Sequence, residues 1–376
     1  MARKKTSGKT VAVIAVAVVL ILGLLVALAY SPPGQTLIEK FMGKLDEGGD
    51  VNGGNGGNTG ILPAYTAIGS DITVGTDVAL DNIVFEAHFI DVGQGDAIVL
   101  EFQDGKTVMI DAGSTSPGLA DCRAETLAYL EHIEVDKIEY LIVTHPDTDH
   151  YNMLEAVMDA YVVDNVIYNA CEKNQTYTGF IERIVEETGN ASMVIDADGE
   201  DYSITGTGYT VNVYAPGYGT FENGNGSYDA DESNGMSPMV VVETAGRRLL
   251  FTGDGTTETE AWFIEKTGGT SYDVDFLKAG HHGSDTSTSQ EFLDFITPEY
   301  CVIMCDNGEE YSHPDTEVMN RLFDMGVVTY RTNRHGNIVL NIDEDGDMAF
   351  AVEREVPAEN NKNGINDLML VTAPAA

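Results

Sequence analysis

The sequence predicts an α/β protein in which two mixed β-sheets pack face to face beneath outer helices, an α/β/β/α sandwich preceded by one N-terminal membrane helix. Two patterns predict the sandwich. Short β-branched runs form clusters separated by Gly-rich turns, and such runs then alternate with segments of helical spacing. A third pattern, one long apolar stretch near the N-terminus, predicts the membrane helix.

The N-terminal pattern is a run of nineteen consecutive apolar residues, 11–29, that follows Arg3-Lys4-Lys5. This length is close to the ~20 residues needed to cross a bilayer and exceeds the usual signal-peptide core of roughly 7–15 residues. The basic residues favour a cytoplasmic N-terminus, so we expect residues 1–30 to anchor an extracellular domain in the cell membrane. Ala27-Leu28-Ala29 also resembles a cleavage site, which leaves a cleaved signal and a secreted protein as the alternative.

Composition then divides the remaining chain. Residues 31–62 contain Pro32-Pro33 and a Gly/Asn-rich tract, and they are predicted to form a flexible linker. Residues 63–355 carry the alternating strand and helix patterns and are predicted to be one folded domain. Residues 356–376 lack apolar periodicity and are expected to form a loose tail.

Apolar alternation gives the elements of the domain in order. The first half is predicted to contain strands at 83–90, 96–102 and 106–113, a helix at 119–134, a strand at 140–145, a helix at 151–160, a strand at 162–168, a helix at 178–187 and a strand at 192–196. The second half is predicted to contain strands at 210–216, 239–245 and 247–254, a helix at 256–266, a strand at 273–279, a helix at 289–296, a strand at 300–304, a helix at 314–325 and strands at 327–331 and 336–342.

Charge and cysteine content exclude several classes of protein. With 61 acidic and 20 basic residues the formal charge is −41, which argues against an unaided electrostatic grip on nucleic acid or on an anionic membrane surface. The four cysteines are too scattered for a disulfide scaffold. Cys301 and Cys305 share the short apolar run EYCVIMCD, where an extended backbone would separate them by ~13 Å, so buried thiols are expected.

Potential metal ligands gather where predicted strands end. The strand at 140–145 leads into His145-Pro146-Asp147-Thr148-Asp149-His150, which offers four ligands within six residues. Two imidazoles and two carboxylates cannot lie unpaired in an apolar core, and His with Asp is a ligand set for Zn²⁺ or Mn²⁺.

Three further clusters follow later strands. They contain Asp254, the adjacent pair His281 and His282, and His313. Because each cluster directly follows a predicted strand, we expect the clusters to meet in one cation-binding site. The alternatives are solvated or capped turns.

Taken together, these segments resemble a known family. HPDTDH resembles the HxHxDH motif of the metallo-beta-lactamase superfamily, with Asp147 at the position of the second histidine. The ordered set FIDVGQGDAIVL, MIDAG, VTHPDTDH, LLFTGD, LKAGHHGS, YSHP and YRTNRHGNIVL resembles the extracellular hydrolase domain of ComEC-type competence proteins over residues 84–342. The many membrane spans of those DNA-uptake proteins have no counterpart in this sequence.

The resemblance implies a metallo-beta-lactamase-like fold with two divalent metal ions, Zn²⁺ or Mn²⁺. His145 and Asp147 would face one ion, Asp149, His150 and a downstream histidine the other, and Asp254 would bridge them. We expect His281 to be the downstream ligand, although the reverse assignment with His282 stays open. Asp149, His282 and His313 are the expected catalytic residues, and Asp111 is expected to orient the ligand turn.

The sequence also departs from the family pattern. It has no histidine between His150 and His281, and Asn234 and Ser237 stand in that interval. Tyr151-Asn152 follows the DH pair where Gly-Gly is frequent in the family.

The expected reaction is cleavage of a phosphodiester, with extracellular DNA as the candidate substrate. An esterase for small molecules or cell-wall material, and a non-catalytic surface module with a decayed metal site, remain the alternatives.

Overall fold

The computed structural model describes residues 73–74, 80–116, 118–171, 173–188, 192–221, 228–306 and 311–354. The expected membrane segment at 11–29, the expected linker and the expected tail lie outside these ranges. Within them, no helix combines the length and the apolar character that a bilayer crossing requires.

The first sheet of the described region has nine strands and mixes both pairing types. Its order is β1 (Thr73–Val74), β16 (Met348–Val352), β15 (Ile338–Asp343), β2 (Ile83–Phe89), β3 (Ala97–Phe102), β4 (Thr107–Ala112), β5 (Lys137–Val143), β6 (Val162–Asn169) and β7 (Ser192–Ile195). Strands from β1 to β4 pair antiparallel, whereas β4 to β7 pair parallel. The parallel half is the part that needs crossover helices.

The second sheet has seven strands in the described region and is also mixed. Its order is β14 (Val328–Arg331), β13 (Tyr300–Ile303), β12 (Phe276–Lys278), β11 (Arg247–Phe251), β10 (Met239–Thr244), β9 (Tyr209–Tyr214) and β8 (Tyr202–Gly206). Strands β11 to β14 pair parallel and β8 to β11 pair antiparallel. Two mixed sheets are therefore present, as the sequence predicted.

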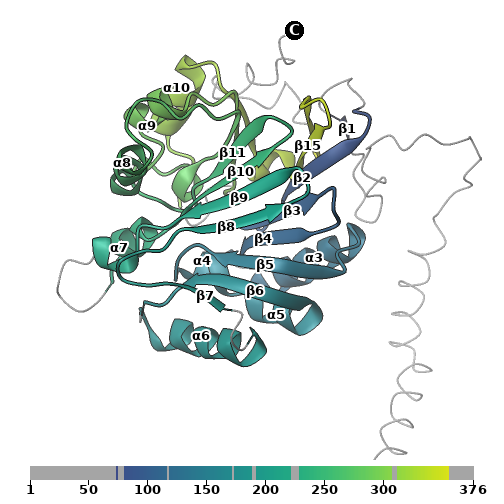
Figure 1. Ribbon diagram of the computed structural model, residues 1–376, viewed down its shortest axis with the longest axis vertical. Helices are drawn as coiled ribbons and strands as arrows, with labels where there is room; N and C mark the ends of the chain where they lie inside the picture. The colour runs from purple at the N-terminus through teal and green to yellow at the C-terminus, as the bar shows by residue number, and fades with distance from the viewer. Residues whose placement is uncertain are drawn as a thin grey trace, which may run out of the picture. The chain divides into compact units, whose positions relative to one another are not determined.

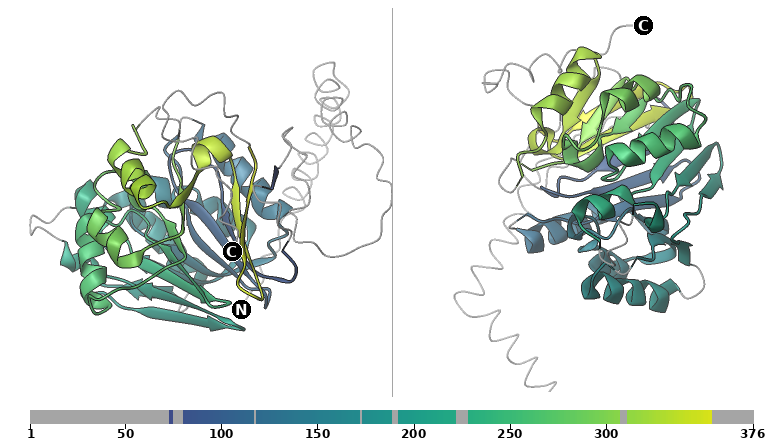
Figure 2. Two further views of the ribbon diagram at one scale, coloured as in Figure 1. Left: turned by 90° about the horizontal axis from the view of Figure 1, so that it is seen from above. Right: turned by 90° about the vertical axis from the view of Figure 1, so that its left-hand side faces the viewer.

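The two sheets enclose one apolar layer, and helices cover both outer faces (Figure 1, Figure 2). The inner layer contains rings from both sheets, including Phe89, Phe251, Phe276 and Phe350. The outer face of the first sheet packs against α3 (Leu119–His132), α5 (Leu154–Ala160) and α6 (Gln175–Thr188). The outer face of the second sheet packs against α8 (Thr257–Lys266), α9 (Gln290–Ile296) and α10 (Thr316–Asp324). The predicted α/β/β/α arrangement is confirmed.

Several short elements were not predicted. They are strands β1, β8 and β16 and the short helices α4 (Thr148–Tyr151), α7 (Ala230–Gly235) and α11 (Thr332–His335). The three helices have four to six residues, too few to show a helical period. The predicted helix at 151–160 is divided between α4 and α5, with Asn152 and Met153 in the turn between them.

The prediction of buried thiols holds for three of the four cysteines. Cys171, Cys301 and Cys305 are buried, Cys122 is half-buried, and all four are free.

The topology brings the ligand clusters to one edge. Strand β5 of the first sheet and strands β11, β12 and β13 of the second are parallel strands whose carboxyl ends lead into the predicted ligand loops. Polar loops at such ends are a common place for sites in α/β proteins. Because the two sheets face each other, loops separated by more than a hundred residues converge there.

Removal of the Phe276 ring should destabilise the fold strongly. Its centroid lies 5.3 Å from Phe89, 5.7 Å from Phe251 and 6.4 Å from Phe350, so Phe276→Ala would leave a cavity between the sheets. We expect the free energy of unfolding to fall by about 3–5 kcal/mol, measured by urea denaturation. Phe323→Ala is the matched control because Phe323 is 40% exposed on α10, and a similar loss there would contradict the packing described.

Glu260 should make stability depend on pH. This buried α8 carboxylate accepts the backbone N–H groups of Thr288 and Ser289, but burial raises its pKa from 4.5 to about 7. The folded state therefore holds a proton that the unfolded chain releases between those values, so this contribution to stability is lost as pH rises from about 4.5 to about 7.

Glu260→Gln cannot ionise, so the stability difference between the variant and the wild type should change by about 1–3 kcal/mol across that window. Urea denaturation at pH 5 and at pH 7.5 measures this change. If the free energy of unfolding depended on pH in the same way in both proteins, the pKa of Glu260 would not be raised in the folded state.

Candidate metal centre

His150 occupies the middle of the site and is oriented by Asp111. The buried His150 ring places Nδ1 2.8 Å from Asp111 Oδ2, which leaves Nε2 directed at the neighbouring loops. Asp111 also accepts the backbone N–H of Thr144 at 2.8 Å and its hydroxyl at 2.6 Å. Asp111 thus orients the ligand turn, as the sequence predicted.

Gly113, in the MIDAG segment, occupies a position with no space for a side chain. A Cβ atom at this position would lie 2.2 Å from the backbone carbon of Asp149 and 2.3 Å from the backbone nitrogen of His150. Any side chain here would push the ligand loop off the end of β4.

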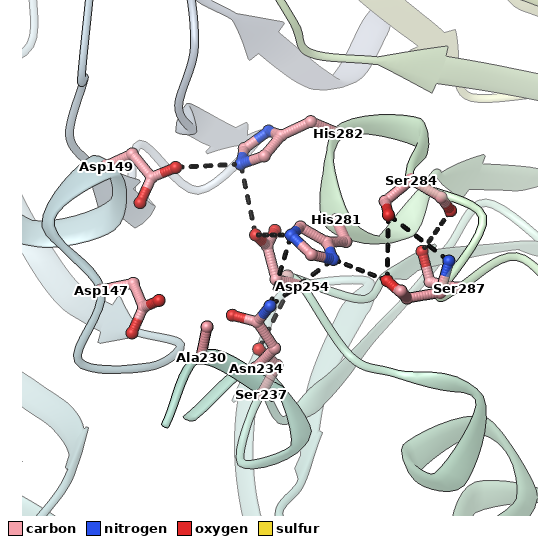
Figure 3. Close-up of polar contacts among 12 residues, drawn as sticks. Asp147, Asp149, Ala230, Asn234, Ser237, Asp254, His281, His282, Ser284 and Ser287 are labelled. Atoms are coloured by element: carbon pink, nitrogen blue, oxygen red, sulfur yellow. Dashed lines mark hydrogen bonds and ion pairs between the residues drawn. The ribbon is translucent and has the colours of Figure 1, made fainter. Parts of the chain in front are cut away.

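Four candidate ligand atoms meet in the centre of the site, and one of them is the Nε2 atom of His150. It lies 3.3 Å from Nε2 of His282 and 3.3 Å from Oδ2 of Asp254. Nε2 of His282 lies 3.3 Å from the same Asp254 oxygen and 3.4 Å from Oδ2 of Asp149 (Figure 3). Ligands held about 2.0–2.1 Å from a tetrahedral ion are separated by roughly 3.3–3.4 Å. The residues therefore fit a divalent cation.

The charges around these rings favour the same conclusion. Burial alone would lower the pKa of His282, but Asp254 and Asp149 raise it to about 10. In the same way, Asp254 and Asp111 raise the pKa of His150 against the effect of burial. Two facing imidazole nitrogens need positive charge between them, from a proton or from a bound cation.

His282, rather than His281, lies among the ligand atoms. Its Nδ1 is 2.9 Å from the Met304 carbonyl oxygen, which directs Nε2 into the centre. His281 places Nδ1 2.8 Å from the Thr286 hydroxyl and Nε2 3.9 Å from Asp254, with its side chain 22% exposed. Both residues have positive φ, 46° and 53°, so the turn sends the two neighbouring rings in different directions.

His145 forms a second group with His150 and Asp254. Candidate ligand atoms of these three residues lie within 4.8 Å of one another. Nδ1 of His145 is 3.0 Å from the Thr144 hydroxyl and 3.3 Å from the Ser237 hydroxyl. Its buried Nε2 and the Asp254 Oδ1 atom have no hydrogen-bond partner in the described region, as expected of a cation site. Burial lowers the pKa of His145 to about 3, so the ring is neutral and able to bind metal.

Asp147 lies apart from both groups. Its Oδ1 contacts the Lys173 ammonium and accepts the Ser233 hydroxyl at 2.6 Å. It joins none of the compact ligand clusters of the described residues, and Figure 3 draws no contact between it and the other labelled side chains.

Asn234 and Ser237 line the side of the site where no histidine is available. Asn234, on α7, places Nδ2 3.3 Å from Nε2 of His281. The Ser237 hydroxyl accepts the backbone N–H of Asp254 at 3.1 Å and so fixes the start of that loop. The segment supplies oxygen and amide groups where the sequence lacks a histidine.

His313 lies beside His281. The two ring centroids are 5.6 Å apart, and the buried Nδ1 of His313 has no hydrogen-bond partner among the described residues. Burial lowers the pKa of His313, which favours the neutral ring.

Lys278 and Asp96 are parts of the site that the sequence analysis missed. Lys278 is fully buried, with Nζ 2.6 Å from Asp96 and 3.9 Å from Asp254. Although burial opposes it, Asp96 raises the pKa of Lys278, so the ammonium stays charged. A lysine inside the apolar strand FLKA was a signal for a buried ion pair.

Comparison with known proteins places this geometry in a family. The family model described as the metallo-beta-lactamase superfamily matches residues 90–305. The chain belongs to the metallo-beta-lactamase superfamily. The match covers β3 to β13 and therefore every residue of the compact ligand groups around His150.

Competence proteins are among the relatives of this metallo-beta-lactamase superfamily hydrolase. It is 26% identical to Recombination protein 2 of Haemophilus influenzae over 71% of this chain and 30% of that protein. It is 26% identical to Competence protein ComA of Neisseria gonorrhoeae over 68% of this chain and 32% of that protein. The chain thus spans about a third of the length of these relatives.

A solved structure described as Tm1679, a metal-dependent hydrolase of the beta-lactamase superfamily, matches 72% of this chain and 99% of that chain. The sequence identity is 12% and the TM-score is 0.43.

The adjacent histidines provide a matched test of the geometry. His282→Ala removes a ring nitrogen from the ligand set and should weaken Zn²⁺ binding by about 100-fold or more. His281→Ala should change affinity by less than about tenfold, because that ring lies 3.9 Å from Asp254 and bonds to Thr286. Competition with a chromogenic chelator measures both values. A larger loss for His281→Ala would contradict this assignment.

Proposed function

We propose that this metallo-beta-lactamase superfamily hydrolase cleaves phosphodiesters outside the cell, with DNA as the candidate substrate and two divalent cations, Zn²⁺ or Mn²⁺, as cofactors. The observation that carries the proposal is the convergence on His282, whose Nε2 atom lies 3.3–3.4 Å from a ligand atom of each of Asp149, His150 and Asp254. Export would follow from the apolar segment at 11–29, as an anchor or as a cleaved signal.

The two cations would be held unequally. The first would be held by Asp149, His150, His282 and Asp254. His282 therefore takes the ligand position that the sequence assigned to His281. His145 and Asp254 would hold the second, which has a single imidazole of its own because the expected ligand Asp147 contacts Lys173 instead. Bound divalent cations lower the pKa of a water molecule and offset charge on a phosphate group. Zn²⁺ and Mn²⁺ both suit this mixture of imidazole and carboxylate ligands.

His281 and His313 are proposed to contact the substrate. Both rings are less buried than His282 and lie next to each other, outside the compact ligand groups of the described residues. A ring N–H placed there can donate to a phosphate oxygen or to the leaving oxygen. Asp149, whose side chain is 17% exposed, is the ligand carboxylate placed to accept a proton from water.

The charge distribution limits how a nucleic acid could bind. Lys278 is buried, while Arg247 and Arg248 form ion pairs with Asp275 and Glu243. In a chain of net charge −41, these side chains do not form a basic track. The resemblance to the hydrolase domain of DNA-uptake proteins favours DNA as the substrate class, and cations in the centre would supply the attraction for phosphate.

Hydrolysis of bis(p-nitrophenyl) phosphate and of single-stranded DNA, with Zn²⁺ or Mn²⁺ at saturation, tests the proposal. We expect turnover that a chelator abolishes, and a loss of about 10²–10⁴-fold in kcat for Asp254→Asn. Glu243→Gln is the control carboxylate, because its side chain is 44% exposed and pairs with Arg248.

The failure outcomes separate the alternatives. Absence of turnover on both phosphodiesters with metal bound would refute the proposal. Turnover of p-nitrophenyl acetate alone would support an esterase. Protein that binds no metal would support a non-catalytic module.

A further inference from the structure

The Asp147 carboxylate already has a cation partner from within the chain. The Lys173 ammonium contacts Asp147 Oδ1 and lies 2.7 Å from the Ser233 hydroxyl, which donates to the same carboxylate oxygen at 2.6 Å. The side chains of Lys173 and Asp147 are 17% and 20% exposed, so the pair is shielded from most solvent. An ion pair in this setting is stronger than one on the surface.

The position of this pair is built by several elements. Lys173 follows strand β6, and at the end of that strand Asn169 donates to the carbonyl oxygens of Thr144 and Met236 at 2.9 and 3.3 Å. These bonds tie β6 to the loop that carries His145 and to the segment after α7. Helix α7 begins with a capping box between Asp229 and Glu232, which fixes the adjacent Ser233.

The two halves of the metal centre are therefore unequal. In the half around His282, the Nε2 atom of His282 lies 3.3–3.4 Å from a candidate ligand atom of each of His150, Asp254 and Asp149, a spacing that fits a shared cation. The half around His145 has two orphaned atoms, His145 Nε2 and Asp254 Oδ1, while the carboxylate expected to complete it is engaged by an ammonium. A divalent ion at that half must displace the Lys173 ammonium from Asp147 or bind without this carboxylate.

We propose that Lys173 is a built-in cation that holds Asp147 away from the metal centre, so that the protein binds one divalent ion tightly and a second one weakly. Lys173 thereby sets the affinity of the second site without being a ligand. The inference rests on the proposed metal centre, but not on the identity of the substrate.

Metal titration of the chelator-treated full chain tests this role. By calorimetry with Zn²⁺, and by elemental analysis after dialysis at fixed free Zn²⁺, we expect the wild type to bind one ion tightly and a second at least tenfold more weakly. Lys173→Met keeps the length of the side chain but removes its charge, and it should tighten the second site by about tenfold or more with the first unchanged. Lys173→Arg, which keeps the charge, should behave as the wild type does.

Two further variants identify the cause. Asp147→Asn in the Lys173→Met background should reverse the gain, because the freed carboxylate is then missing. Lys137→Met is the matched control, since Lys137 pairs with Glu139 and Asp164 on the first sheet and is 37% exposed.

An unchanged or weaker second site in folded Lys173→Met, with folding checked by circular dichroism, would overturn the inference. Tighter binding without phosphodiester turnover in any variant would support the role of Lys173 and refute only the proposed reaction.

Discussion

Burial of several carboxylates around a few cationic groups is the constraint on which the rest of this site depends. Asp96, Asp111 and Asp254 are all at most 2% exposed, and an isolated carboxylate in such a place costs several kcal/mol. The positive charges of Lys278, of the His150 and His282 rings and of a divalent ion bound between the ligand atoms would offset that cost. Removing one member leaves the others uncompensated, which makes the site a single electrostatic unit.

The fold makes this unit possible by collecting strand ends. Each sheet has a parallel half, and the carboxyl ends of β5, β11 and β12 supply His145, Asp254 and His282 from loops that would otherwise be unrelated. Strands and outer helices satisfy the backbone around the site, while the apolar layer between the sheets holds the two edges at a fixed separation. The ligand loops themselves carry little apolar surface, so their positions depend on this frame.

Much of this arrangement could be predicted, and the failures have physical reasons. The periodic runs gave the order of strands and helices because long elements bury one regular face. Strands β8 and β16 were missed, and each of them forms by pairing with a neighbouring strand, β9 or β15. The adjacent rings of His281 and His282 could not be ranked, since the positive φ angles that separate them are imposed by the surrounding turn.

The sequence by itself determined which chemical groups are available: the HPDTDH segment, Asp254, the histidine pair and the strand before each, because these depend only on residue type and local period. Tertiary structure alone decided how the groups are used. Lys173 reaches Asp147 across 26 residues, Ser233 reaches it across 86, and Lys278 meets Asp96 inside the protein. Ion pairs and ligand geometry act over a few ångströms in space, and distance along the chain carries almost no information about such contacts.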